Sequence, residues 1–461
     1  MNKYFSRLLL LIILFSSLGG IRGGLAQSLA DITADVTLSA SNYVCYRGAA
    51  APDPTAAPKG YKPCYISSYA RHGSRWLIQP DQYASACRKM HRADSLGLLT
   101  PRGCEVMEVL DRMVNVSAGR LGELTDIGAE QHRGIGARMA SRWPDIFKKG
   151  GFIEARSTPV IRCIFSMENE LWSLKQANPA LDVRTDASEA DWWYLNCQGS
   201  KARRTLMTNE QYQAGMAVLD KFNKAHQSEY DAMDQRLARQ LFTDVEKASE
   251  VVKVADLRDQ LFSLANNMQS HSFTIEGGHA TAYPVFKADW NLYPLFTADE
   301  LHLLWQRDNW LWYINYGHAP VTGEGGAFSQ TNLLRDFIAA ADSCLAMPPA
   351  KANTRHHAAT LRFGHETCVL PLTCLMELGN AGYRATDPDD LEQHWRNYEI
   401  FTMASNVQLI FFRSPKAGAP ILVKALLNEA EISIGPLKPY SPGCYLWSDV
   451  KAFWTAKLAG K

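Results

Sequence analysis

Short apolar runs alternate with amphipathic helical patterns over the first 200 residues of the chain. Strands are predicted at residues 65–69, 152–156 and 181–184, and helices at about 101–113, 125–143 and 158–174. Thr100 and Pro101 supply an N-cap and a first-turn proline for the first helix, and Thr125 is the N-cap of the second. This alternation predicts an α/β domain whose sheet is mainly parallel and flanked by helices.

The pattern changes between residues 200 and 325, where long polar and charged helical segments dominate and strand signals are few. Two of these segments are 209–238 and 244–268. A helix at 332–346 and strands at 359–363, 407–412 and 421–427 are predicted after this region. We therefore predict one α/β catalytic domain made of residues 27–199 and 326–461, with a mostly helical second domain, 200–325, inserted into it.

The first 26 residues have the features of a secretory signal peptide. Lys3 and Arg7 precede an apolar run at 8–15, and small residues up to Ala26 fit a cleavage site after that residue. Its removal takes away three cations and no acids, so the formal net charge moves from +1 to −2. We expect a periplasmic or secreted protein that binds no membrane after signal removal and, being nearly neutral, no nucleic acid.

The ten cysteines all follow the predicted signal peptide. An even number in an exported chain predicts that most of them form disulfides, although the spacing does not fix the pairing. No C-x-x-C motif occurs, and Val369 stands where a zinc-protease motif beginning at His365 would need a second histidine. We therefore expect no metal and no other cofactor.

Three segments at predicted strand ends, 71–75, 156–158 and 361–367, carry arginine, histidine or glutamate. Ligands of open α/β sheets bind at the carboxyl ends of strands, so these segments can contribute to one pocket. Guanidinium groups bind phosphoryl oxygens in bidentate fashion, and an imidazole nitrogen can attack phosphorus directly. The residue types therefore indicate chemistry on a phosphate group.

These segments resemble, in content and order, the motifs of the histidine acid phosphatase family. The matching motifs are Arg71-His72-Gly73-Ser74-Arg75, Arg156-Ser157-Thr158 and Gly364-His365-Glu366-Thr367, with a helix segment at 124–132 between the first two. Segments 425–429 and 444–447 are similar to the C-terminal part of the multiple inositol polyphosphate phosphatase branch, which includes phytases. The resemblance extends from about residue 61 to residue 453 and is weakest in the middle.

The resemblance implies that His72 is the nucleophile and forms a phosphohistidine, and that Glu366 is the proton donor. It further implies phosphate binding by Arg71, Arg75, Arg156 and His365. The chain departs from the family where Glu366 directly follows His365, because members usually have Asp, or alanine and then Glu. It also has Trp76 where many members have proline.

We therefore expect an exported phosphomonoesterase that hydrolyses organic phosphate esters, with inositol polyphosphates such as phytate as favoured substrates. One alternative is a broad-specificity acid phosphatase acting on sugar or nucleotide phosphates, and another is a phosphate-ester binding protein without turnover. The expected partner is a small-molecule phosphate ester. Arg88, Lys89 and Arg92 are candidates for binding further phosphates, although a solvated helix face explains them equally well.

Overall fold

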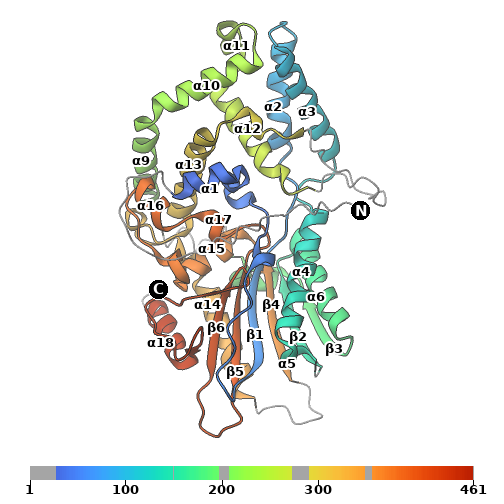
Figure 1. Ribbon diagram of the computed structural model, residues 1–461, viewed down its shortest axis with the longest axis vertical. Helices are drawn as coiled ribbons and strands as arrows, with labels where there is room; N and C mark the ends of the chain where they lie inside the picture. Colours follow the sequence, from blue (N-terminus) through green and yellow to red (C-terminus); the bar gives the residue numbers. More distant parts are fainter. Residues whose placement is uncertain (1–26, 149, 197–206, 272–289, 348–355, 460–461) are drawn as a thin grey trace, which may run out of the picture.

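The computed structural model describes residues 27–148, 150–196, 207–271, 290–347 and 356–459. Figure 1 shows a sheet with flanking helices at one end of the long axis and a group of helices at the other. The predicted signal peptide and Cys197 lie outside the described residues. Within these residues, no helix is long and apolar enough to cross a membrane.

The strands form one mixed sheet in the order β3-β2-β4-β1-β5-β6-β7, and β8 pairs with β6. Their bounds are β1 Lys62–Arg71, β2 Gly151–Ser157, β3 Leu181–Asp186, β4 His357–Gly364, β5 Asn406–Arg413, β6 Leu422–Leu427, β7 Ala430–Ile432 and β8 Tyr445–Leu446. The first four strands pair in parallel, as predicted. The last four pair antiparallel, so the α/β class is confirmed but the parallel arrangement covers only half of the sheet.

Two apolar cores lie on opposite faces of the sheet because successive strand residues point to opposite sides. Ile66 of β1 belongs to the core that also contains residues of α4 (Asp126–Arg142) and α6 (Ile161–Ala177). Tyr65 belongs to the other core, together with residues of α14 (Thr331–Ala346). Helices on both faces explain why the central strands β1, β4 and β5 are buried along almost their whole length, instead of alternating between buried and exposed positions.

The helix starts predicted from N-cap residues are confirmed. Thr100 accepts a hydrogen bond from the Gly103 main-chain nitrogen at the start of α3 (Pro101–Ser117). Thr125 accepts one from the Gly128 nitrogen at the start of α4. The remaining helices outside the helical region are α1 Gln27–Ala34, α5 Pro144–Phe147, α7 Trp192–Leu195, α15 Glu366–Leu375, α16 Pro388–His394, α17 Asn397–Ile400 and α18 Trp447–Leu458.

The helical region contains helices from two separate parts of the chain. Its helices are α2 Pro80–Asp94 and α3, together with α9 Asn209–Ala225, α10 Gln227–Leu241, α11 Val245–Val251, α12 Val254–Met268 and α13 Ala298–Tyr316. Here α2 packs against α12, and α3 packs against α10 (Figure 1). The helical region therefore also contains residues from before position 200. The domain boundaries at residues 200 and 325 stay a prediction.

Each of the two long helices predicted at 209–238 and 244–268 is divided into two shorter helices. The segment 209–238 is divided at His226, which leaves the helical conformation between α9 and α10. No proline or glycine marks this break. Because α9 packs against α13 while α10 packs against α3 and α12, the change of partners accounts for the break, and such a cause is not visible in a local pattern.

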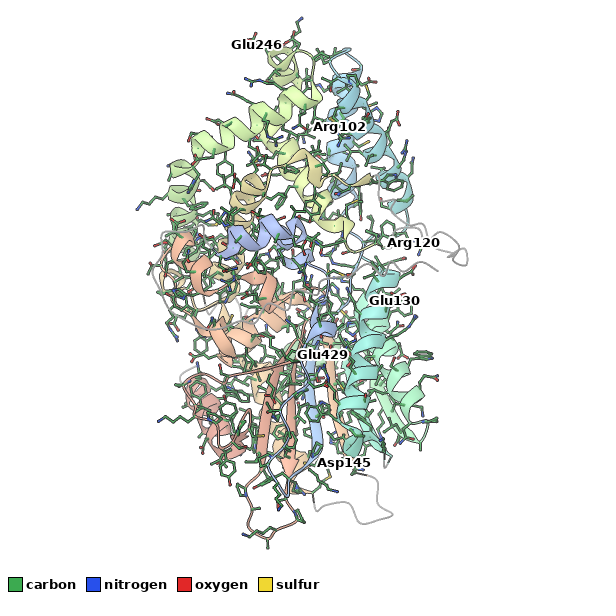
Figure 2. All side chains as sticks on the ribbon, in the orientation of Figure 1. Arg102, Arg120, Glu130, Asp145, Glu246 and Glu429 are labelled. Carbon is green, nitrogen blue, oxygen red and sulfur yellow. The ribbon has the colours of Figure 1, made fainter. Side chains whose placement is uncertain are left out.

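Labelled side chains mark the two ends of the long axis and the region between them. Glu246 lies at the outer end of the helical region and Asp145 toward the opposite end, with Glu429 between them (Figure 2). Glu429 lies in the turn between β6 and β7, where its buried carboxylate pairs with Arg138 and Arg142. This ion-pair network attaches the C-terminal hairpin to α4.

The nine cysteines within the described residues are all free thiols. The structure therefore gives no support to the disulfides predicted from the even cysteine count. Most of these thiols are buried, and burial raises the pKa of several of them. Buried thiols of this kind behave as small apolar side chains and are weakly reactive.

Candidate active site

His72 is the first residue after β1, and its side chain is fully buried. Its Nδ1 lies 2.8 Å from the main-chain oxygen of Gly73. A carbonyl oxygen can only accept a hydrogen bond, so Nδ1 carries the proton and Nε2 keeps a free lone pair. Burial, reinforced by the charge of Arg162, lowers the pKa of His72 well below its usual value, so the ring is neutral.

The turn after His72 lies against the start of α4 at a contact between two glycines. A Cβ on Gly73 would lie 2.4 Å from the Gly128 carbonyl oxygen, and a Cβ on Gly128 would lie 2.2 Å from the Ser74 carbonyl oxygen. Neither position has room for any side chain, which explains why both segments carry glycine. The contact fixes where the His72 turn lies relative to α4.

Arg71 and Arg75 bring two buried guanidinium groups to the same site. Arg71 donates through Nη1 to two main-chain oxygens, and its Nε lies 3.2 Å from Glu366 Oε2. Arg75 donates through Nη1 to the Trp76 oxygen at 3.0 Å. Burial lowers the pKa of Arg71 to about 10, so the group stays charged at neutral pH. Both guanidinium groups are therefore held in place by the main chain and keep further donors available.

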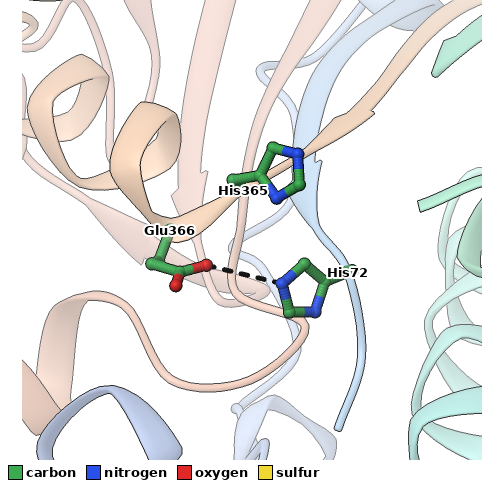
Figure 3. A group of neighbouring side chains, drawn as sticks. All are labelled: His72, His365 and Glu366. Carbon is green, nitrogen blue, oxygen red and sulfur yellow. Dashed lines mark ion pairs between the residues drawn. The ribbon is translucent and has the colours of Figure 1, made fainter. Parts of the chain in front are cut away.

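The third segment reaches the site because β4 ends at Gly364 and α15 begins at Glu366. Figure 3 shows the Glu366 carboxylate directed toward the His72 ring, with His365 nearby. Glu366 Oε2 lies 3.4 Å from His72 Nε2. Burial raises the pKa of Glu366, but the charges of Arg71 and Arg75 and the contact with His72 together outweigh burial and hold the pKa well below its usual value.

His365 lies beside His72, with the two ring centroids 5.6 Å apart. Its main-chain nitrogen donates to the Tyr69 hydroxyl, and its Nε2 lies 3.3 Å from Thr158 Oγ1. Burial lowers the pKa of His365 to about 4, so its ring is neutral at physiological pH. A neutral imidazole can donate one hydrogen bond to a bound anion.

Arg156 is not brought into this group. Its side chain is 32% exposed, with Nε 3.6 Å from Asp191 and Nη1 3.9 Å from Asp186. In β2 the residues 151, 153, 155 and 157 are buried, and Arg156 alternates with them onto the opposite face. This strand parity is readable in the sequence and is the signal that argues against Arg156.

Arg162, in the first turn of α6, lies in the group instead. Its charge acts on His72, Arg75 and Glu366, and its own pKa is lowered by burial. Its Nη1 donates to the Gly122 oxygen at 3.3 Å, while its Nε has no partner. The family motif had favoured Arg156 in the sequence, but the first turn of α6, which follows the end of β2, brings Arg162 to the group.

Tyr43 also reaches the site and was not selected from the sequence. It ends the 3-10 helix η1 (Val36–Tyr43), and its ring lies 5.3 Å from the Arg75 guanidinium carbon. Its hydroxyl accepts a 3.5 Å hydrogen bond from Arg75 Nη2. No local signal predicts this contact, because η1 lies about 30 residues before Arg75 and carries no motif.

Buried polar atoms without a hydrogen-bond partner gather at this site. Within the described residues these atoms include Nη2 of Arg71, Nε2 of His72 and the Nε atoms of Arg75 and Arg162. Three guanidinium groups against one carboxylate leave an excess of two positive charges. Buried charges and donors are costly unless they are compensated, so the group is suited to a dianion with several acceptor oxygens.

Comparison with known proteins gives matches only among solved structures, since no family model and no curated protein matches the chain. The multiple inositol polyphosphate phosphatase of Bifidobacterium longum, in complex with inositol hexasulfate, matches with a TM-score of 0.71 and 19% identity over 90% of this chain and 97% of that chain. Its phosphate complex gives 0.71 and 20%, over 91% and 98%. A phytase from D. castellii gives 0.64 and 14%, over 92% and 86%. The chain therefore has the fold of the multiple inositol polyphosphate phosphatase and the phytases, the histidine acid phosphatase fold that its motifs predicted.

Proposed function

We propose that the protein is a phosphomonoesterase that works through a phosphohistidine at His72. One observation carries this proposal: the neutral, buried His72 keeps its Nε2 lone pair free beside Arg71 and Arg162, with Glu366 3.4 Å away. A nucleophile, fixed cations and a carboxylate are the parts that phosphoryl transfer requires.

In the first step, Nε2 of His72 attacks phosphorus, and the N–P bond forms as the ester P–O bond breaks. The departing oxygen takes a proton from Glu366, which lies within reach of a phosphoryl group bound at Nε2. A bound dianion offsets the guanidinium charge that lowers the pKa of Glu366, so substrate binding itself favours the protonated carboxyl.

In the second step, water attacks the phosphohistidine while the Glu366 carboxylate accepts its proton. The N–P bond breaks, inorganic phosphate leaves and His72 returns to its neutral form. Arg71, Arg75 and His365 hold the phosphoryl oxygens, as expected from the motifs, and we assign the third guanidinium to Arg162 in place of Arg156. Donors that are already oriented stabilise the charge spread over these oxygens without reorganising.

Inositol polyphosphates such as phytate are the substrates that we propose. The fold likeness supports them, because the similar phosphatase from Bifidobacterium longum was solved with inositol hexasulfate and with phosphate. Of the three candidate cations of α2, two are engaged within the protein: Arg88 pairs with Asp81, and Lys89 donates to Ser85 and Gln260. Binding of further phosphates by these residues and Arg92 stays a prediction. We also propose export by cleavage after Ala26, which sequencing of the mature N-terminus would test.

A panel of phosphate esters tests the proposal. Purified protein should release phosphate from phytate and from nitrophenyl phosphate, and a quenched reaction should contain phosphohistidine at position 72. His72→Ala should lose at least about four orders of magnitude in turnover, as expected for a lost covalent nucleophile. His226→Ala, which changes a histidine in the helical region, is the matched control.

Three results would favour other functions. Near-normal turnover by His72→Ala would exclude the proposed nucleophile. Faster hydrolysis of sugar or nucleotide phosphates than of phytate would favour a broad-specificity phosphatase. Tight phosphate binding without turnover of any ester would favour the binding protein.

A further inference from the structure

Three side chains with metal-ligating atoms converge in the helical region, outside the catalytic group. Cys87 and His91 lie one turn apart on α2, and Asp111 lies on the neighbouring helix α3 (Figure 1). Cys87 Sγ is 3.1 Å and His91 Nε2 is 2.7 Å from the same atom, Asp111 Oδ1. All three ligating atoms lie within 4.8 Å of one another.

The geometry follows from helix periodicity and packing. Residues four apart on a helix share one face, so Cys87 and His91 point to the same side of α2. That side faces α3, which supplies Asp111. Cys87 is buried, whereas His91 and Asp111 have side-chain exposures of 49% and 39%. The cluster therefore has a closed side at the thiol and an open side toward solvent.

We propose that Cys87, His91 and Asp111 bind a divalent cation of the zinc type, with solvent water as the fourth ligand. Thiolate, imidazole and carboxylate are the three ligand classes that Zn²⁺ uses in proteins, and a mixed set of low coordination number favours it over Mg²⁺ or Ca²⁺. With the thiol deprotonated, the three ligands carry two negative charges, which a divalent cation neutralises.

Only small shifts separate the present arrangement from a coordinated one. In the structure the Asp111 oxygen accepts from the Cys87 thiol and interacts with the His91 ring. Zinc–ligand bonds of about 2.0–2.3 Å place tetrahedral ligand atoms roughly 3.3–3.7 Å apart, so the side chains must open by about 0.5 Å. The half-exposed His91 has room to move, and the Cys87 proton leaves to solvent as the metal–sulfur bond forms.

The cation next to Cys87 on α2 is already paired with a carboxylate, since Arg88 is engaged by Asp81 at 2.9 Å. In contrast, the catalytic residues His72, His365 and Glu366 also lie within metal-ligating distance of one another, but three guanidinium groups disfavour a cation there. The proposed site is independent of the proposed phosphatase activity. The bound metal ion is expected to cross-link α2 and α3 and so to stabilise their packing.

Cobalt titration of the reduced, chelator-treated protein tests the site. We expect one Co²⁺ per chain, tetrahedral d–d absorption and a sulfur-to-metal charge-transfer band, all displaced by Zn²⁺. Cys87→Ser should abolish the charge-transfer band. His91→Gln and Asp111→Asn should each raise the Kd for Co²⁺ by at least about tenfold to a hundredfold, because loss of a direct ligand costs no less than loss of its supporting partner.

Two control variants make the result specific. Cys104→Ser changes the cysteine of α3, which is not part of the cluster, and should bind Co²⁺ like the unaltered protein. His72→Ala disrupts the catalytic group and should keep the charge-transfer band. A band absent from the unaltered protein, or one that survives in Cys87→Ser, would overturn the proposal. Because His91 is half-exposed, His91→Gln should leave the fold intact. Circular dichroism would verify that all the variants are folded.

Discussion

Arg156 and Arg162 are six residues apart, and the structure gives them different surroundings. Arg156 faces two carboxylates at the surface, whereas Arg162 acts on His72 and Glu366. Removing one preorganised cation typically costs about 10²–10³ in rate, so Arg162→Ala should lower kcat/KM by that factor and weaken inhibition by phosphate and vanadate. Arg156→Ala is the matched control, with an expected loss of less than about tenfold. If steady-state kinetics showed a larger loss of kcat/KM for Arg156→Ala than for Arg162→Ala, Arg156 would be the residue that binds the phosphate.

Glu366 is the second residue whose role can be isolated, through the leaving group. An inositol alkoxide needs a proton as the ester bond breaks, whereas nitrophenolate leaves without one. General acid catalysis contributes roughly 10²–10⁴ in rate. Glu366→Gln should therefore slow phosphoenzyme formation from phytate far more than from nitrophenyl phosphate, as measured by rapid quench. Equal slowing with both esters would mean that the proton donor is another group.

At the scale of the elements, the contact between the His72 turn and α4 limits which residue types the helix can have at position 128. Gly128→Ala would push a Cβ to 2.2 Å from the Ser74 oxygen, whereas Gly134→Ala on the same helix meets only the tip of the Arg138 side chain. Overpacking of this kind costs about 1–3 kcal/mol, and an alanine in an open helix position gains about 0.5–1 kcal/mol over glycine.

We therefore expect denaturant unfolding to show a larger loss of stability for Gly128→Ala than for Gly134→Ala, because a main-chain oxygen cannot give way as a side-chain tip can. The first variant should also lose phosphatase activity, because the displaced turn carries His72. If both variants were equally stable, the close approach of the two glycines would not be a constraint on the fold.

At the scale of the whole molecule, buried histidines make stability depend on pH. Burial lowers the pKa of His365 to about 4 and of His271 to about 3, and it lowers that of His72 as well. As the pH falls below about 6.5, the unfolded chain takes up protons that the folded protein does not. The histidine contribution to the free energy of unfolding should therefore level off above pH 6.5 and fall toward pH 4.5, by up to roughly 1.4 kcal/mol per pH unit for each histidine.

The variant His271→Gln isolates one part of this dependence. His271 packs against Trp76, with ring centroids 4.4 Å apart, and is not part of the proposed catalytic group. Its replacement should reduce the slope between pH 6.5 and 4.5 by about 1.4 kcal/mol per unit in denaturant titrations. An unchanged slope would show that His271 titrates alike in the folded and unfolded chain.

Local features of the sequence determined the elements and most of the candidate site. Apolar runs and N-caps located β1, β2, β4 and the starts of α3 and α4, because side-chain periodicity and capping act within a few residues. The motifs predicted that His72 and Glu366 lie in one site because strand ends in an α/β fold converge on one edge, and the two side chains do lie together. The fold class and the likeness to phosphatases followed from the same local information.

Tertiary structure alone decided what depends on partners distant in sequence. The antiparallel direction of β5 to β8, the break at His226 and the contact of Tyr43 with Arg75 each depend on which elements pack together. Cys87 and His91 share one face of α2, and only the packing of α3 brings Asp111 within 4.8 Å of them. Periodicity specifies the face that a residue occupies, but only the packed chain specifies what that face meets, since such contacts join residues tens to hundreds of positions apart.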